Sequence, residues 1–239
     1  MADPGSDHDT LSLSEIYASI QGESTLAGWP CVLVRLAGCP FRCAYCDTPE
    51  ARDERVGQRV PIGEIVRRVR SLGLPLVELT GGEPLAQDAA RGLATRLLDA
   101  GYRVLIESGN SVSIEGIDPR ARLILDLKTP DSGMSEQQRW ENLALLKPED
   151  EIKIVLCSRS DYEWARDLVL QRNLTEQHVV HFSPAEATVT SRLEDTPSLA
   201  RRRRITRREL AEWILADRLA VRLNLQLHLW IWGRGRRGV

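Results

Sequence analysis

Long hydrophobic runs are absent from the sequence: no apolar stretch reaches the roughly 18 residues that a membrane-spanning helix requires. A secretory signal is also missing, because residues 1–10 are polar and acidic and contain no basic segment followed by an apolar one. Neither sign of charge dominates, since 32 Lys and Arg residues are balanced by 34 Asp and Glu residues, for a net charge of −2. We therefore expect a cytoplasmic protein that binds neither a membrane nor nucleic acid over an extended surface.

The length of 239 residues, with 42% hydrophobic and 28% charged residues, predicts one domain with a sizeable core. We expect residues 1–10 to form a disordered tail and residues 11–239 to form a single domain. Residues 185–204 are rich in Ser, Thr, Glu and Arg and are predicted to be a surface loop.

Apolar segments of two kinds alternate along the chain. Short segments rich in β-branched residues predict strands at 31–36, 76–79, 103–106, 123–127, 152–156 and 179–182. Helical spacing of apolar residues predicts helices at 62–69, 90–98, 140–146, 164–170 and 209–223, while 111–121 is too short and Pro-broken for one. Strands that alternate with helices imply right-handed βαβ units and a parallel sheet. We predict an α/β fold, an open partial (β/α)6-type barrel of mostly parallel strands, although periodicity alone leaves a doubly wound sheet open.

Polar residues follow four successive predicted strands. The first strand runs into a cluster of cysteines, and the next three run into residues 80–84, 107–110 and 126–128. In either architecture the active site lies beyond the carboxyl ends of the parallel strands. These four segments are therefore expected to form one shared site.

Three of the five cysteines, Cys39, Cys43 and Cys46, have the spacing C-x3-C-x2-C. Clustered thiols in a cytoplasmic protein indicate metal binding or redox chemistry rather than disulfides. A structural zinc site usually takes four ligands in two pairs, and no second pair exists here. Three thiolates on one loop match a 4Fe–4S cluster whose fourth iron stays open to another ligand, with zinc or a redox thiol as the alternative. Cys31 and Cys157 lie in or at the end of predicted strands and are interpreted as buried small apolar residues.

This loop resembles that of the radical S-adenosylmethionine superfamily, in which the open iron binds the amino and carboxylate groups of S-adenosylmethionine. In that superfamily the reduced cluster splits the sulfonium to a 5′-deoxyadenosyl radical. Tyr45 and the Gly-Gly-Glu-Pro run at 81–84 also suit the superfamily pattern. The resemblance implies that the Gly-Gly-Glu run holds the methionine amino group, and a carboxylate is a natural partner for an ammonium.

The flanking residues resemble the 7-carboxy-7-deazaguanine synthase family, the ring-contracting radical enzymes of queuosine biosynthesis. The resemblance rests on residues 16–24, 28–30, 46–48, 126–130 and 182–184, and on the C-terminal segments 225–228 and 231–233. It implies a lyase that converts 6-carboxy-5,6,7,8-tetrahydropterin into 7-carboxy-7-deazaguanine with loss of ammonia. The implied cofactors are a 4Fe–4S cluster, S-adenosylmethionine and Mg²⁺. The implied partners are an electron donor such as flavodoxin or ferredoxin and a second copy of the chain in a homodimer.

The resemblance also implies a role for each matching residue. Cys39, Cys43 and Cys46 would hold the cluster, and Thr48 would bind Mg²⁺, a cation that takes oxygen ligands and keeps water or substrate in its shell. The implied contacts to S-adenosylmethionine are Tyr45, Asp47, Gly82, Glu83, Ser108, Asp126 and Lys128. The implied substrate contacts are Ile20, Gln21, Gly22, Arg35, Thr80 and His228. Among them Arg35 would hold the substrate carboxylate, a role that suits a guanidinium group.

Two alternatives remain open at this stage. A glycyl-radical activating enzyme shares the three-cysteine loop and the short barrel, although nothing here resembles the second cysteine set that many activators carry. A noncatalytic module could bind zinc with its cysteines and RNA with its arginines, but the charge balance and the four polar strand ends argue against it. The arginines at 201–204 are interpreted as a solvated face, and His8, His178 and His181 receive no predicted role.

Overall fold

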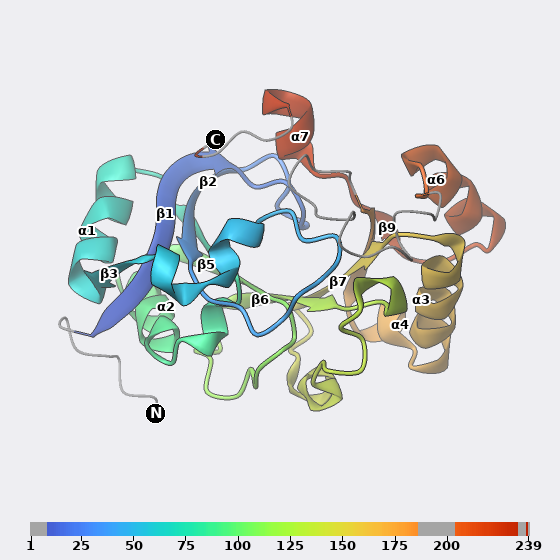
Figure 1. The fold of residues 1–239 in the computed structure, drawn as a ribbon, viewed down its shortest axis with the longest axis horizontal. Coiled ribbons are helices and arrows are strands. Elements are labelled where there is room, and N and C mark those ends of the chain that lie inside the picture. The colour runs from blue at the N-terminus through green and yellow to red at the C-terminus, as the bar shows by residue number, and fades with distance from the viewer. Residues whose placement is uncertain (1–8, 186–203, 234–237, 239) are drawn as a thin grey trace.

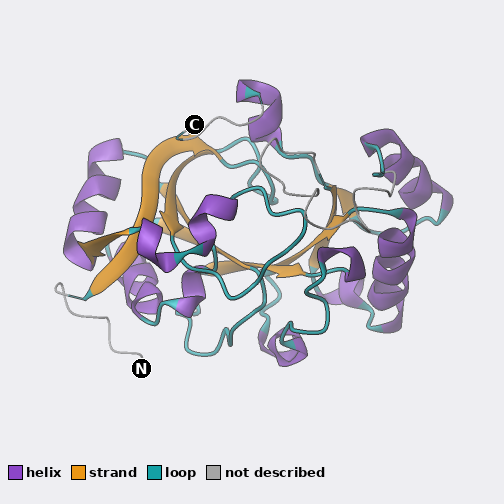
Figure 2. Ribbon diagram, in the orientation of Figure 1, coloured by secondary structure: helices purple, strands orange, loops and turns teal. Residues whose placement is uncertain are grey.

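A curved sheet wrapped by helices dominates the computed structural model, which describes residues 9–185, 204–233 and 238. Nine strands in these described residues form the sheet, in the order β3-β1-β2-β4-β5-β6-β7-β8-β9. Figure 2 shows the strands as an incomplete ring with most helices on its outer side. The predicted open barrel is therefore confirmed, because the order ends in two edge strands that do not pair with each other.

All six predicted strands are present. They are β2 (Pro30–Leu36), β4 (Leu76–Gly81), β5 (Arg103–Ser108), β6 (Arg122–Leu127), β7 (Glu151–Leu156) and β8 (Val179–Pro184). Each pairs in parallel with the next in this order. Their apolar runs follow from burial on both faces, because helices cover one side and the other side faces the barrel interior.

Three further strands were not predicted: β1 (Thr10–Ile20), β3 (Gln58–Pro61) and β9 (Arg222–Leu223). β1 is antiparallel to both β2 and β3, and its register with β2 shifts between Leu13 and Glu15. That irregularity interrupts the alternation of apolar and polar residues by which a strand is recognised. β1 begins at Thr10, inside the expected tail, whereas residues 1–8 and 186–203 lie outside the described part of the chain.

The outer layer contains α1 (Ile62–Leu72), α2 (Ala89–Asp99), α3 (Arg159–Gln171) and the short α4 (Leu174–Gln177), and the first three were predicted. Buried apolar residues of these helices and of the strands form one large core between helices and sheet. The helix predicted at 140–146 is a 3-10 helix (Trp140–Leu145), and 111–121 forms no helix, as expected. None of the helices in the described ranges has the length and hydrophobicity of a bilayer span.

The C-terminal part differs from its prediction. α6 (Arg207–Ala216) ends well before residue 223, because Arg218 adopts a positive φ of 53° that an α-helix does not accommodate. The chain then forms β9 and the short α7 (Leu227–Trp232). Short 3-10 helices occur in the loops, at Pro49–Arg52, Glu54–Val56, Pro84–Ala86 and Pro130–Ser132.

The interior of the barrel is layered. Cys31, Leu76, Leu105 and Ile124 form an apolar cluster inside the ring. Because residues two apart on a strand share a face, the next inward positions on β4 and β6 are Glu78 and Asp126. A polar layer therefore lies directly above an apolar one, on the side toward which the parallel strands point.

Candidate functional site

A cavity of about 270 Å³ lies at the carboxyl ends of the parallel strands. All residues predicted to bind the cluster, Mg²⁺ or the substrate line it. So do all residues predicted to contact S-adenosylmethionine except Glu83 and Ser108. The curvature of the sheet thus brings together side chains from both ends of the chain, from Ile20 to His228.

One side of the cavity is the cysteine loop, which we define as residues 39–48. It follows β2 directly and is held by backbone bonds, because the Cys39 amide donates to Arg52 O at 3.0 Å and the Ala44 amide donates to Ser132 O at 3.1 Å. Arg52 also donates a hydrogen bond to Cys43 O at 2.7 Å. The loop is therefore fixed at three points before any ligand binds.

The three thiols of this loop fit an iron–sulfur cluster. Burial raises the pKa of Cys39 to about 11 and also raises the pKa of Cys43, so these two thiols are protonated at neutral pH. Cluster binding must displace these protons, as metal binding to thiols does in general. In the described residues no three Cys, His, Asp or Glu side chains converge on one point, as the ligands of a single zinc ion would.

The two glycines after β4 allow backbone segments to approach each other closely. A Cβ atom on Gly81 would lie 2.0 Å from Leu36 O, and one on Gly82 would lie 2.3 Å from Gly38 O. The Glu83 amide donates to Gly38 O at 2.8 Å, which joins this turn to the start of the cysteine loop. The glycines thus position the loop itself, in addition to any approach that they permit to a ligand.

Glu83 and Ser108 lie behind the cavity wall. Glu83 is fully buried, and its carboxylate accepts hydrogen bonds from the Leu85 and Gly109 amides at 3.1 and 2.8 Å and from the hydroxyl of Ser108 at 3.1 Å. These side chains support the wall that Gly82 and Gly109 form. Their contact with S-adenosylmethionine stays a prediction.

Asp126, Lys128 and Tyr45 form a group beside the thiols. The Lys128 Nζ lies 2.9 Å from Asp126 Oδ2 and 5.8 Å from the centre of the Tyr45 ring. Burial opposes the charge of Lys128, but Asp126 and Cys43 outweigh it and raise the pKa of the lysine. Asp126 Oδ1 and the Tyr45 hydroxyl are buried without a hydrogen-bond partner. Buried polar atoms are normally satisfied, so both atoms indicate a polar ligand in the cavity.

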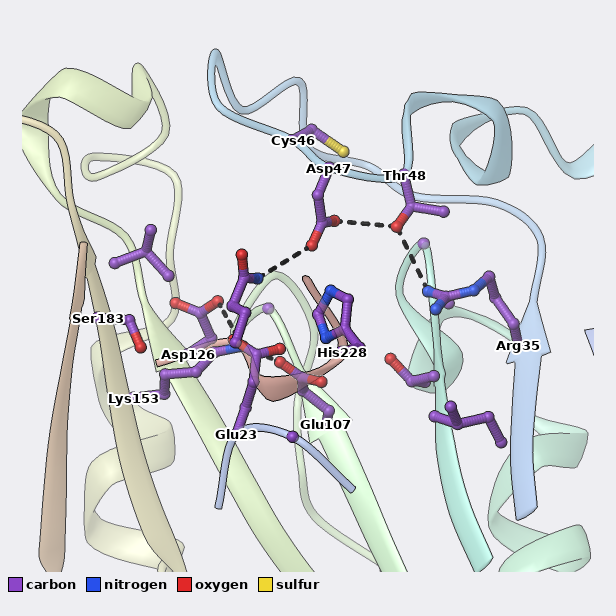
Figure 3. Close-up of a pocket in the computed structure, with 18 of the residues that line it drawn as sticks. Glu23, Arg35, Cys46, Asp47, Thr48, Glu107, Asp126, Lys153, Ser183 and His228 are labelled. Carbon is purple, nitrogen blue, oxygen red and sulfur yellow. Dashed lines mark hydrogen bonds and ion pairs between the residues drawn. The ribbon is translucent and has the colours of Figure 1, made fainter. Parts of the chain in front are cut away.

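A second group lies across the cavity (Figure 3). The Arg35 Nε donates to Glu15 Oε1 at 2.9 Å, and its NH1 donates to Thr48 Oγ1 at 3.4 Å. The Thr48 hydroxyl donates to Asp47 Oδ1 at 2.9 Å. Burial opposes ionisation of Asp47, but Arg35 and Lys153 outweigh it and lower its pKa. A carboxylate, a hydroxyl and a guanidinium thus face one space, which suits a hard cation together with an anionic group.

The base of the cavity contains charged residues that were assigned no ligand contact from the sequence. We call Glu23, Glu78, Glu107 and Asp126 the acidic floor; of these only Asp126 was predicted to contact a ligand, while Glu107 belongs to the segment 107–110 that was expected in the site. Lys153 on β7 lies among them and forms ion pairs with Glu107, with Glu23 at 3.6 Å and with Asp126 at 3.8 Å. A sequence signal existed, because Glu78 and Lys153 interrupt apolar strands in the same way as Arg35.

The segment after β1 closes the cavity together with the C-terminal residues. Gln21 Oε1 accepts hydrogen bonds from the Glu23 and Ser24 amides at 3.0 and 3.1 Å, which fold the segment into a tight turn. A Cβ atom on Gly22 would lie 3.3 Å from His228 Nδ1. Predicted substrate residues from the two ends of the chain are therefore in contact. Thr80 lies beside Arg35 in the parallel register of β4 and β2.

The match to known proteins agrees with this geometry. Residues 33–169 match the Radical SAM superfamily, so the chain belongs to the class of radical S-adenosylmethionine enzymes. It is 43% identical over 232 residues to the 7-carboxy-7-deazaguanine synthase of Chlorobaculum tepidum, covering 96% of this chain and 97% of the relative. It is 39% identical over 232 residues to the same enzyme of Koribacter versatilis, covering 96% and 100%. The chain therefore belongs to the 7-carboxy-7-deazaguanine synthase family.

The fold agrees with a solved structure as well. The structure of QueE from Escherichia coli superposes with a TM-score of 0.70 at 19% identity and covers 92% of this chain and 95% of that one. The matches to the superfamily and to the two relatives confirm the expected superfamily and family, and this structure confirms the fold. Family membership does not favour the glycyl-radical activating enzyme or the zinc-dependent RNA-binding module.

Proposed function

We propose that the chain converts 6-carboxy-5,6,7,8-tetrahydropterin into 7-carboxy-7-deazaguanine with loss of ammonia. The observation that carries this proposal is the single cavity in which the three thiols of the cysteine loop lie across from the acidic floor. This cavity combines a site for a radical-generating cofactor at the thiols with a site for a small molecule rich in N–H groups at the acidic floor. Relatedness over nearly the whole chain to enzymes of this name supports it.

Cys39, Cys43 and Cys46 would hold a 4Fe–4S cluster, whose chemistry when reduced is the cleavage of bound S-adenosylmethionine to a 5′-deoxyadenosyl radical. Gly82, Tyr45 and Asp126 would line the space for that cofactor beside the cluster. The unpartnered Asp126 Oδ1 and Tyr45 hydroxyl supply an acceptor and a donor for its polar groups. Lys128 holds Asp126 through its ion pair and so fixes where the free carboxylate oxygen lies.

Arg35 would bind the carboxylate of the pterin. Its Nε donates to Glu15, its NH1 donates to Thr48, and the side chain lines the cavity. Glu15 therefore acts as an anchor that limits the rotation of the guanidinium.

The acidic floor would bind the opposite edge of the pterin, where the amino-pyrimidinone ring carries N–H donors. Burial raises the pKa of Glu78 to about 8, whereas Lys153 outweighs burial and lowers the pKa of Glu107. At neutral pH the floor thus offers an ionised acceptor at Glu107 beside a protonated Glu78, a pattern that suits a ring edge with both donors and an acceptor.

Mg²⁺ would bind at Thr48, with the carboxylate of Asp47 beside it. Mg²⁺ is usually held by one or two protein groups together with water and substrate oxygens, which matches the small number of donors here. This placement gives Asp47 a role near the metal as well as the predicted contact with S-adenosylmethionine. Ile20, Gln21, Gly22, Thr80 and His228 would complete the walls around the substrate.

The same family resemblance leads us to propose a homodimer, an electron donor such as flavodoxin or ferredoxin, and a cytoplasmic location.

The test is an anaerobic assay of the full chain reconstituted with iron and sulfide. Reductant, S-adenosylmethionine, Mg²⁺ and 6-carboxytetrahydropterin are added, and the products are followed by mass. Formation of 7-carboxy-7-deazaguanine supports the proposal. Deoxyadenosine alone would support radical chemistry on another substrate, and neither product from a protein with an intact cluster would contradict an enzymatic role.

A further inference from the structure

Lys153 is a buried lysine inside the barrel, one of only three lysines in the sequence. Its side chain is 5% exposed and ends in the cavity, between β5, β6 and the turn after β1. It forms ion pairs with Glu107 on β5, Asp126 on β6 and Glu23 in the turn. Figure 3 shows these four side chains together at the base of the cavity. In the described residues, Glu23 and Glu107 form ion pairs with no other lysine or arginine.

Burial of these charges costs desolvation free energy. A buried ammonium loses its hydration, and only close carboxylates and hydrogen bonds offset that loss. The reverse also holds, because Glu23, Glu107 and Asp126 are neighbouring buried acids that would repel one another without a central cation. In other proteins, apolar residues of similar volume often stabilise a fold at least as well as a buried ionic group does. The group instead faces the space where the proposed substrate binds.

We propose that Lys153 is a positioning residue of the substrate site. Its ammonium, shared among three acids, keeps the Glu23 and Glu107 carboxylates separated and directed so that they can accept the N–H groups of the pterin. This inference rests on the proposed function. Lys153 itself acts through these two carboxylates, because its ammonium donates a hydrogen bond to Glu107 and lies 3.6 Å from Glu23 and 3.8 Å from Asp126.

The geometry of β7 supports this assignment. Glu151, two residues before Lys153 on the same inward face, accepts hydrogen bonds from the Thr25 hydroxyl at 2.5 Å and the Thr25 amide at 2.9 Å. Lys153 therefore holds Glu23 at one point of the turn while Glu151 holds Thr25 at another. His181 supports this second point, with its Nε2 2.6 Å from Glu151 Oε2. β7 thus holds the turn at two places: Glu151 binds the backbone at Thr25, and Lys153 pairs with the Glu23 side chain.

The experiment compares Lys153→Met with Lys153→Arg and with Lys147→Met. Lys147 pairs with Asp150 at the outer end of β7 and is not part of the cavity lining, so Lys147→Met is the matched control. Each full-length variant is reconstituted with its cluster, and kcat, KM for the pterin and the ratio of deoxyadenosine to product are measured. Binding of 6-carboxypterin, which keeps the same ring edge, is measured by equilibrium dialysis without the cluster.

Lys153→Met is expected to raise KM and weaken 6-carboxypterin binding by about tenfold or more, since it leaves buried carboxylates unpaired. Iron content should not change, and deoxyadenosine should accumulate relative to product because the substrate is held less accurately. Lys153→Arg should restore part of the affinity, and Lys147→Met should resemble the unaltered protein. If Lys153→Met does not fold, Lys153→Gln removes the charge with a smaller perturbation and should change KM in the same direction.

The outcomes separate the two proposals. Wild-type KM, binding and product ratio in a folded Lys153→Met or Lys153→Gln variant overturn the role of Lys153. Equal losses in the Lys147→Met control also overturn it, because they indicate a general effect on folding. Absence of product from the unaltered, cluster-loaded protein overturns the proposed function instead.

Discussion

The cysteine loop and the acidic floor lie on two sides of the same cavity but are built in different ways. The loop is one continuous segment of ten residues, 39–48, held by backbone hydrogen bonds within the loop and to Arg52 and Ser132. The floor is assembled from single residues on β4, β5, β6 and the turn after β1, separated by as many as 103 positions between Glu23 and Asp126. The comparison shows that a binding site can combine a motif, which is local, with a set of charges that only the sheet brings together.

The largest effect is expected on the loop side, from Cys43→Ala. Loss of one of three thiols should remove the brown cluster and all product formation, because no other thiol of the loop can replace it. Iron and sulfide content, absorbance and product mass provide the measurement. Cys31→Ala, at a buried thiol outside the cavity, is the control and should keep both iron and activity. Iron retained by Cys43→Ala would remove this residue from the cluster site.

The next effect concerns the floor and its response to pH. The ordinary pKa of a glutamate is about 4.5, and burial beside Glu107 and Glu23 raises the pKa of Glu78 to about 8. Between these values the folded protein keeps a proton that the unfolded chain has released. The Glu78 contribution to stability is therefore complete below about pH 4.5 and is lost as the pH rises to about 8.

Chemical denaturation of Glu78→Gln measures this contribution. From about pH 5 to about pH 8 the free energy of unfolding of the unaltered protein should fall by about 3 kcal/mol more than that of the variant. Glu64→Gln is the control, since hydrogen bonds from Arg68 and Arg67 lower the pKa of Glu64 and its contribution changes only in acid. Parallel pH profiles of Glu78→Gln and the unaltered protein would show that Glu78 is ionised in the fold.

A smaller effect is expected where the loop meets the sheet. Gly82→Ala places a Cβ atom 2.3 Å from Gly38 O and 2.7 Å from Ala51 O, so backbone must move. We expect a loss of about 2 kcal/mol in the free energy of unfolding, with poorer cluster incorporation. Gly109→Ala is the control for stability, because its nearest contact would be an ordinary 3.5 Å. Equal stability of the two variants would contradict close packing at Gly82.

The smallest effect is expected at Thr48. Thr48→Ala should leave the cluster intact but raise the Mg²⁺ concentration for half-maximal activity about tenfold, or about 1.4 kcal/mol, because one oxygen ligand is lost. Titration of Mg²⁺ in the product assay measures this change. Thr95→Ala on the outer helix α2 is the control. An unchanged Mg²⁺ response in Thr48→Ala would separate Thr48 from the metal.

Features that depend on residues close together in the sequence were predicted, whereas features that depend on remote residues or on irregular backbone were not. The six parallel strands and the cysteine loop were predicted because each depends on a pattern within a few residues. β1 was missed because a register irregularity breaks its alternation, and β9 was missed because it has only two residues. The end of α6 was predicted too late because apolar residues continue past Arg218, where the backbone turns out of the helix.

The residues of the site also divide into those that the local sequence predicts and those that depend on tertiary contacts. Arg35 was recognised as a charge inside an apolar strand, and the same reasoning applied to Glu78 and Lys153 would have found the centre of the floor. The contact of Glu83 with the cofactor stays a prediction, whereas the hydrogen bond that its carboxylate accepts from Ser108, a residue 25 positions away, was not predicted. No local pattern indicates that pairing, because it depends on β4 and β5 being neighbours.

By itself the sequence determined the class of cofactor chemistry, the six predicted parallel strands and the order in which polar segments follow them. These features depend on the spacing and alternation of residues, and each such pattern lies within a short stretch of the chain. The tertiary structure decided which charges share the cavity, and it placed Lys153 among Glu23, Glu107 and Asp126. The physical reason is that electrostatic partnership depends on distance in space and on burial, both of which the curvature of the sheet creates.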